Sequence, residues 1–134
     1  MSLQYSPKNN PRVIIIQKLY GKYFNDEKNL TFPKHRFKKF IKDIVKGTIE
    51  RSDVINDEIK KHLSSDVNLK NLDTLFQIII KSAIFELLYK VNTPVKIIIK
   101  EYLNASNYFL EEPQTKYLNA LLDKISKKIR NSNG

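Results

Sequence analysis

The chain lacks cysteine altogether and contains only two histidines among its 134 residues. Without a thiol, neither a disulfide framework nor a thiolate metal site can form. The two histidines, His35 and His62, lie in separate segments, and neither stands beside a cluster of carboxylates. We therefore expect no bound metal and no other cofactor.

Long hydrophobic runs and the residue sets of common catalysts are also missing. The longest apolar run, around Leu75 to Leu88, is interrupted by polar side chains and falls short of the roughly 20 residues that span a bilayer. The opening, MSLQYSPKNNPR, lacks the apolar core of a secretory signal. There is no glycine-rich phosphate loop, no metal-ligand spacing and no plausible nucleophile–base pair. These absences predict a cytoplasmic binding protein with no membrane partner, not an enzyme.

Acidic residues are scarce relative to basic ones: 14 against 24, which gives a formal net charge of +10 at pH 7. Such an excess indicates a polyanionic partner, with nucleic acid ahead of membrane, although lysine-rich composition also follows from AT-rich coding. Residues 36–47 concentrate basic side chains on one face of a helical pattern, opposite an apolar stripe. This face fits a solvated surface or a phosphate-binding one. Its cations are Arg36, Lys38, Lys39, Lys42 and Lys46.

Strand signals are absent, since no segment alternates with a period of two and no Asn-Gly or Asp-Gly turn joins apolar runs. We expect an all-α fold, a compact bundle of about six to seven helices. Residues 12–130 should form one domain with sub-bundles at 12–63 and 72–130, between a flexible basic tail at 1–11 and a frayed tail at 131–134. Helices are expected at 12–24, 33–49, 53–63 and 73–89, and from Pro94 and Pro113 onwards. The 73–89 helix is apolar on most sides and should lie at the centre.

The joint between the last two predicted helices carries polar and aromatic residues that could lie on the surface. Phe109 and Tyr117 flank a short acidic turn, with Lys116 and Asn119 beside them. A flat ring, a cation and an amide suit unpaired bases, which need a stacking surface, a phosphate partner and a hydrogen-bonding edge. The alternative is that both rings complete the core of a two-helix corner.

Two carboxylates, Glu86 and Glu101, lie within apolar helical segments. A buried carboxylate is costly unless it is paired or hydrogen-bonded, and perturbed acids often mark functional sites. A structural interpretation is that each meets a helix N-terminus or a basic side chain such as Arg12, which would tie the two halves of the chain together.

Three blocks of the sequence, in the same order, resemble the bacterial NusB family. The first is IIQKLYGKY, with Gln17, Leu19 and Tyr20, and the second is IKSAIFEL in the 73–89 helix. The third covers the last two helices without a gap, and its matching residues are Pro94, Lys96, Glu101, Ala105, Phe109, Lys116, Tyr117, Asn119, Leu122, Asp123 and Lys124.

The resemblance implies a transcription antitermination factor of two helical sub-bundles. Members of that family bind the single-stranded boxA element of ribosomal RNA operon transcripts together with NusE, a small-subunit ribosomal protein, and so act on the RNA polymerase elongation complex. Carried over by position, the residues implied in RNA binding are Lys8, Arg12, Tyr20, Phe109, Lys116, Tyr117 and Asn119. The resemblance leaves open whether the protein is a monomer or a homodimer.

The N-terminal segment departs from the family pattern. Family members often begin with a run of arginines, whereas SPKNNPR offers only Lys8 and Arg12 as cations. Each lost phosphate contact lowers the salt slope of binding, so RNA affinity would be weaker or displaced onto the lysine-rich helix. Two alternatives follow: a protein–protein adaptor of the NusB fold with weak RNA binding, or an accessory domain that partners an RNA methyltransferase.

Overall fold

The structure is a computed structural model that describes residues 6–25, 30–62 and 72–131. The predicted linkers around 26–29 and 63–71, the first five residues of the predicted tail and residues 132–134 lie outside this description. Over the described residues the fold is all-helical, as predicted, with no strand. One 3₁₀ helix precedes six α-helices: η1 (Pro7–Asn9), α1 (Pro11–Asn25), α2 (Lys38–Glu50), α3 (Ser52–His62), α4 (Thr74–Tyr89), α5 (Val95–Ser106) and α6 (Glu112–Asn131).

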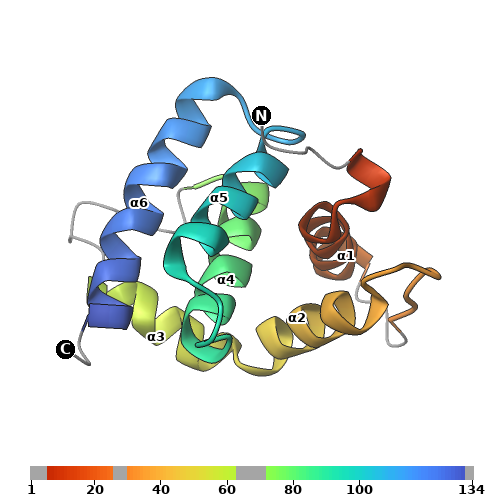
Figure 1. Cartoon of the computed structure of the whole chain (residues 1–134), viewed down its shortest axis with the longest axis horizontal. Helices are drawn as coiled ribbons and strands as arrows, with labels where there is room; N and C mark the ends of the chain where they lie inside the picture. Colours follow the sequence, from red (N-terminus) through yellow and green to blue (C-terminus); the bar gives the residue numbers. More distant parts are fainter. Residues whose placement is uncertain (1–5, 26–29, 63–71, 132–134) are drawn as a thin grey trace.

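Helix α4 is the centre of the bundle, which confirms the prediction from its all-round apolar pattern. It packs against each of the other five α-helices, and Figure 1 shows it between α1 and α2 on one side and α6 on the other. Residues from Phe76 to Leu87 are buried almost without interruption. Helix α3 packs against α4 and α6 as well as α2, so the two predicted sub-bundles share one continuous core.

Helix α1 begins one residue earlier than predicted, and the segment before it is folded. The Asn10 side chain is buried, and its Oδ1 accepts hydrogen bonds from the backbone N–H groups of Arg12 (3.0 Å) and Val13 (3.3 Å). Pro11 occupies the first helical position, where a missing N–H costs nothing. Asn followed by Pro is thus a strong helix start, and residues 6–11 do not form the flexible tail that we expected.

Helices α2, α4 and α5 each begin without a side-chain cap bond. Helix α2 begins at Lys38 and not near residue 33, because residues 33–37 take an irregular path. Helix α5 begins at Val95, one residue later than predicted, with Pro94 as its N-cap. Asp73 is the N-cap of α4 but makes no side-chain cap bond; its backbone carbonyl accepts the Gln77 N–H at 3.0 Å.

The last turns of α6 close the corner between α4 and α5. Arg130 Nε donates to the Leu87 carbonyl at 2.7 Å, and its two Nη atoms donate to the carbonyls of Lys90 (3.1 Å) and Thr93 (3.2 Å). Carbonyls at a helix C-terminus have no partner within the helix. One guanidinium therefore satisfies several acceptors at the end of α4.

Candidate nucleic-acid interface

Arg12, a predicted RNA contact, is instead part of the core. Its Nη2 lies 2.6 Å from Glu86 Oε1 and its Nε donates to Glu86 Oε2 at 3.1 Å. The guanidinium also lies over the rings of Phe40 and Tyr102, 5.0 Å and 5.4 Å from their centroids. The Arg12 side chain is 10% exposed and that of Glu86 0%. This corrects the assignment of Arg12 and confirms the structural interpretation of Glu86.

The surroundings of this pair shift the pKa of Arg12 and that of the neighbouring Tyr102. Burial is the largest single influence and lowers the pKa of Arg12, but the charge and hydrogen bond of Glu86, together with Tyr102 and Glu101, outweigh it, so the pKa is raised. The Tyr102 hydroxyl is fully buried, and burial together with the adjacent Glu86 charge raises its pKa well above the ordinary value. The pair is therefore a fixed structural element and has no exposed charge to offer a ligand.

Lys116 and Asn119 lie together at the joint of α5 and α6. Both line a pocket of about 540 Å³, with Leu103, Asn107 and Glu112 on its other walls. The Lys116 ammonium is exposed and lies 3.4 Å from Glu112 Oε1, one turn back along α6. An exposed pair of this kind is weak, so Lys116 can exchange its carboxylate partner for a phosphate.

The two aromatic contacts predicted at this joint, Phe109 and Tyr117, are placed differently from each other. Tyr117 is 39% exposed, and its ring stacks on Phe76 of α4 with centroids 5.6 Å apart and planes at 21°. One ring face is thus supported by protein. Phe109 is half-buried and packs against the core. Tyr117 follows Lys116 directly, so its side chain is rotated about 100° around α6, and neither ring lines the pocket of Lys116 and Asn119.

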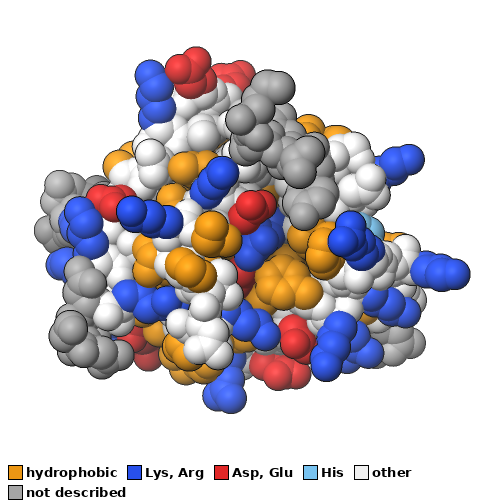
Figure 2. Space-filling model, in the orientation of Figure 1, with side chains coloured by type: hydrophobic (Ala, Val, Ile, Leu, Met, Phe, Trp, Pro, Cys, Tyr) orange, Lys and Arg blue, Asp and Glu red, His pale blue; other side chains and the backbone are white. Residues whose placement is uncertain are grey.

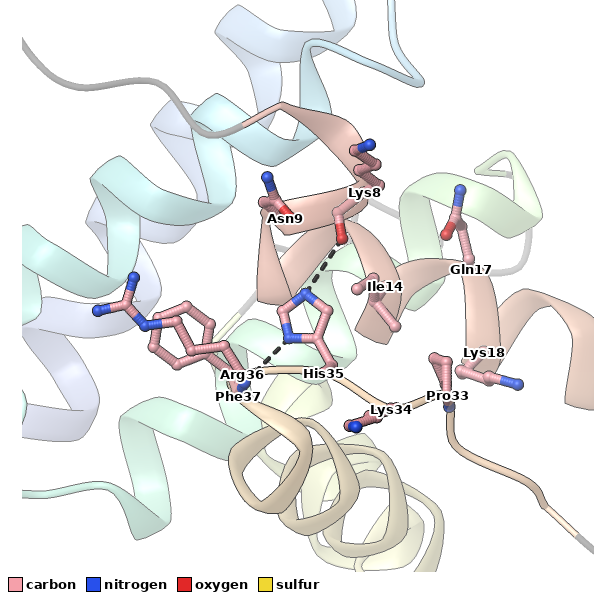
Figure 3. Close-up of a pocket in the computed structure, with 10 residues that line it drawn as sticks. All are labelled: Lys8, Asn9, Ile14, Gln17, Lys18, Pro33, Lys34, His35, Arg36 and Phe37. Carbon is pink, nitrogen blue, oxygen red and sulfur yellow. Dashed lines mark hydrogen bonds between the residues drawn. The ribbon is translucent and has the colours of Figure 1, made fainter.

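A second and larger hollow of about 760 Å³ lies between η1, α1 and residues 33–37. Figure 3 shows Lys8 and Asn9 on one wall, Gln17 and Lys18 on α1, and Lys34 and Arg36 opposite. We call it the basic groove and define it by Lys8, Gln17, Lys18, Lys34, His35 and Arg36. Tyr20 is 41% exposed and follows Gln17 by three residues on the same face of α1.

Sequence reasoning identified Lys8 but missed the wall made by residues 33–37. The prediction assigned these residues to the first turn of the lysine-rich helix, whereas they precede it. One sequence signal indicated that this segment precedes the helix. Pro33 is followed by the basic residues Lys34, His35 and Arg36, and the run contains no residue that commonly caps a helix.

Two kinds of site are absent from the described residues, namely metal-binding clusters and membrane-spanning helices. Within residues 6–25, 30–62 and 72–131, no three His, Cys, Asp or Glu side chains are grouped so as to hold a metal ion. In the same part of the chain, every helix is too short or too polar to cross a membrane. Exposed rings, amides and cations on an all-helical scaffold define the class as a helical binding protein with a cationic surface.

The chain belongs to the NusB family, whose profile matches residues 4–127. This is a family of transcription antitermination factors, not of enzymes. Curated relatives named transcription antitermination protein NusB include those of Caulobacter vibrioides (26% identical, covering 92% of this chain and 95% of that protein), Mesorhizobium japonicum (30%, covering 69% and 59%) and Rickettsia bellii (36%, covering 63% and 54%). The alignments with the last two thus span less than two thirds of those proteins.

The fold agrees with a solved member of the family. The structure of T. maritima NusB superposes with a TM-score of 0.77 at 21% sequence identity, and the match covers 94% of each chain. At this identity the comparison establishes the shared fold.

Proposed function

We propose that this protein is an antitermination factor that binds a boxA-like single-stranded RNA of ribosomal RNA operon transcripts. It would do so together with NusE, the small-subunit ribosomal protein, and through that complex act on the RNA polymerase elongation complex in the cytoplasm. The observation that carries the proposal is the family match over residues 4–127.

The exposed groups at the start of α6 suit single-stranded RNA. The outer face of Tyr117 is open while Phe76 supports its inner face, which prepares the ring for stacking on a base. Asn119 presents an amide that can read a base edge, and the neighbouring Lys116 supplies a charge for phosphate. Lys8 and Tyr20 remain candidates on the η1–α1 side, and Arg12 is withdrawn.

Binding is tested by gel shift with a boxA-like RNA, with and without NusE, over a range of salt concentrations. The proposal expects a shift that NusE strengthens and a scrambled RNA does not reproduce. No shift under any of these conditions would refute RNA recognition. A complex with NusE that forms without RNA would then support the adaptor function.

The Tyr117→Ala variant should weaken boxA binding by about 1–3 kcal/mol, the usual value of a base–aromatic stack. Its matched control is Tyr89→Ala, because Tyr89 is 40% exposed and its ring lies 4.9 Å from that of Phe85, much as Tyr117 lies against Phe76. The control should lose comparable stability and keep its RNA affinity. Equal RNA affinity in both variants would remove Tyr117 from the interface.

Phe109→Ala and Lys116→Ala should differ from Tyr117→Ala. Because Phe109 is half-buried against the core, its truncation should lower the melting temperature, and any loss of affinity is to be corrected for unfolded protein. Lys116→Ala should weaken binding to different RNA sequences alike and flatten the salt dependence, since a phosphate contact carries no base information.

The alternative function, a protein–protein adaptor with weak RNA binding, is favoured by the burial of two predicted RNA contacts. Burial of Arg12 and partial burial of Phe109 leave fewer side chains for RNA than the family pattern implies. An adaptor would bind NusE with an affinity that does not change when RNA is added, which titration calorimetry of the pair measures directly.

A further inference from the structure

We propose that the basic groove is a phosphate-binding track for single-stranded RNA, with Lys34 and Arg36 as contacts that take over from a basic N-terminal run. The inference rests on the proposed function in taking RNA as the ligand. It adds a site formed by residues 33–37, which lie far from the joint of α5 and α6 in the sequence.

The described walls of the groove carry positive charge without a counter-charge. Lys8, Lys18, Lys34 and Arg36 line it, and no carboxylate among the described residues does. Among the described residues none of these four cations forms an ion pair, whereas Lys61, Lys90, Lys116 and Lys127 each have a carboxylate within 4 Å. Figure 2 shows Lys and Arg side chains along the right-hand margin of the molecule without acidic side chains among them. Like charges gathered without counter-charges repel each other, and a phosphate backbone relieves that repulsion.

His35 fixes the geometry of the groove. Its Nε2 lies 3.1 Å from the Lys8 carbonyl, and because a carbonyl can only accept, Nε2 carries the proton. Its Nδ1 accepts the Phe37 N–H at 2.9 Å. The neutral ring thereby joins η1 to the start of α2 across 27 residues, as the dashed lines in Figure 3 show. Lys8 and Arg36 are held on opposite walls before any ligand arrives.

The remaining wall residues suit a nucleotide strand and not a lipid surface. Gln17 and Asn9 offer amides beside the cations, and the exposed Tyr20 ring follows Gln17 on α1. Cations and amides in a concave site, with an exposed ring beside it, are groups used to bind single strands. Membrane-surface binding would need a protruding apolar face that inserts between headgroups, whereas the apolar side chains here, Ile14, Pro33 and Phe37, line a concave surface beside the cations.

The test compares two double variants of the full chain that remove the same charge. Lys34→Ala with Arg36→Ala acts within the groove, and Lys42→Ala with Lys46→Ala acts on exposed positions of the same lysine-rich segment outside it. Affinity is measured by fluorescence anisotropy against a boxA-like RNA and against oligouridylate, from 50 to 200 mM salt. Circular dichroism and the melting temperature establish that both variants are folded.

The salt slope is the change in log affinity with log salt concentration. The groove variant should have a slope smaller by about 1.4 on both RNAs, because each of the two lost phosphate contacts contributes about 0.7 on a single strand. Its affinity deficit should therefore shrink about sevenfold between 50 and 200 mM salt. The control variant should keep nearly the wild-type slope. Equal losses in both variants would show a net-charge effect and overturn the groove.

The two proposals fail separately. If the groove variant has a smaller salt slope on both RNAs, but the protein shows no preference for boxA and no effect of NusE, the antitermination function is refuted and the groove proposal stands. If the protein prefers boxA but the groove variant keeps the wild-type salt slope, the groove proposal fails and the antitermination function stands. Binding of phosphatidylserine vesicles by the wild type, with no binding of either RNA, would overturn the RNA track in favour of a membrane surface.

Discussion

The Arg12–Glu86 contact joins α1 to α4 across 74 residues of sequence. It is the one ion pair among the described residues in which both side chains are at most 10% exposed. Two charges removed from water gain little net stability from each other, because desolvation offsets their attraction. Removing one of them leaves the other buried and unpaired, which is much worse. The pair therefore matters chiefly through the cost of breaking it.

Arg12→Ala or Glu86→Gln should lower the free energy of unfolding by about 3–5 kcal/mol. The double variant Arg12→Met with Glu86→Leu should recover most of this loss, since it leaves no buried charge. Urea unfolding followed by circular dichroism measures all three. Lys8→Ala, an exposed cation nearby, should remain within about 0.5 kcal/mol of wild type. A single variant as stable as wild type would show that the charge at that site is solvated.

The sequence named both members of this pair but did not decide the role of Arg12, which was a possible partner for a buried carboxylate and also a candidate RNA contact. Glu86 lies among four apolar residues, and a buried carboxylate is costly without a partner. The sequence therefore predicted that Glu86 is paired. The apolar neighbours are Ile84, Phe85, Leu87 and Leu88. Arg12 stands just after a polar segment at the start of a helix, where cations are usually solvated. Nothing in the local sequence shows that α1 is buried along the face that carries Arg12.

At the scale of the helices, α2 and α4 approach each other where a glycine meets an aromatic ring. The end of the Phe85 ring occupies the space that a Cβ on Gly47 would take. Gly21, in α1, has nothing within 4 Å of the corresponding position. Both glycines lie inside helices, so they share the same backbone cost and differ only in what surrounds them.

Gly47→Ala should destabilise the protein by about 1–3 kcal/mol through overpacking, despite the better helix propensity of alanine. Gly21→Ala should stabilise it by about 0.5–1 kcal/mol, because only the propensity gain applies. Thermal unfolding of both variants side by side tests the pair. If the two substitutions shift the melting temperature equally, the Phe85 ring moves aside at no cost and the contact is loose.

The helices themselves were readable from apolar spacing, whereas their beginnings depended on contacts that are not local. Helix α2 starts late because the N–H of Phe37, its N-cap residue, donates to the His35 ring, and that ring is itself held by the Lys8 carbonyl. No Ser, Thr, Asp or Asn marks that start. The early beginning of α1 could have been read from Asn10 and Pro11, a local cap.

Across the whole molecule, α4 is the element that every other α-helix shares. Ile80 and Leu87 are fully buried on it, so each contributes to a core that joins the two halves of the chain. A single cooperative unfolding transition is expected from such an arrangement.

Ile80→Ala or Leu87→Ala should cost about 2–5 kcal/mol, as truncation of buried aliphatic side chains usually does. The control is Ile97→Ala on α5, where the side chain is 45% exposed and the loss should be under about 1 kcal/mol. Urea titration should show a lower midpoint with an unchanged slope for the core variants. A split transition would mean that the two halves unfold independently.

The candidate site could be predicted at this scale only in part. Order and spacing of residues along α6 were enough to place Lys116 and Asn119 together, because i and i+3 share a face. The basic groove could not be foreseen, since it is assembled from η1, α1 and residues 33–37 by tertiary contacts. The sequence shows which cations exist, and only the fold shows which of them meet.

The guanidinium of Arg130 also constrains the order in which the protein can mature during its synthesis. The Leu87 carbonyl accepts from Arg130, which is translated 43 residues later. At the usual speed of the ribosome, the donor is synthesised about 2–9 s after the acceptor. Until then the Leu87 carbonyl lacks its Arg130 donor, so we expect the end of the central helix to stay hydrated in the nascent chain. Translation of the last helix is thus the step that completes the domain, and a pause before it would expose α4 to proteases and chaperones for correspondingly longer.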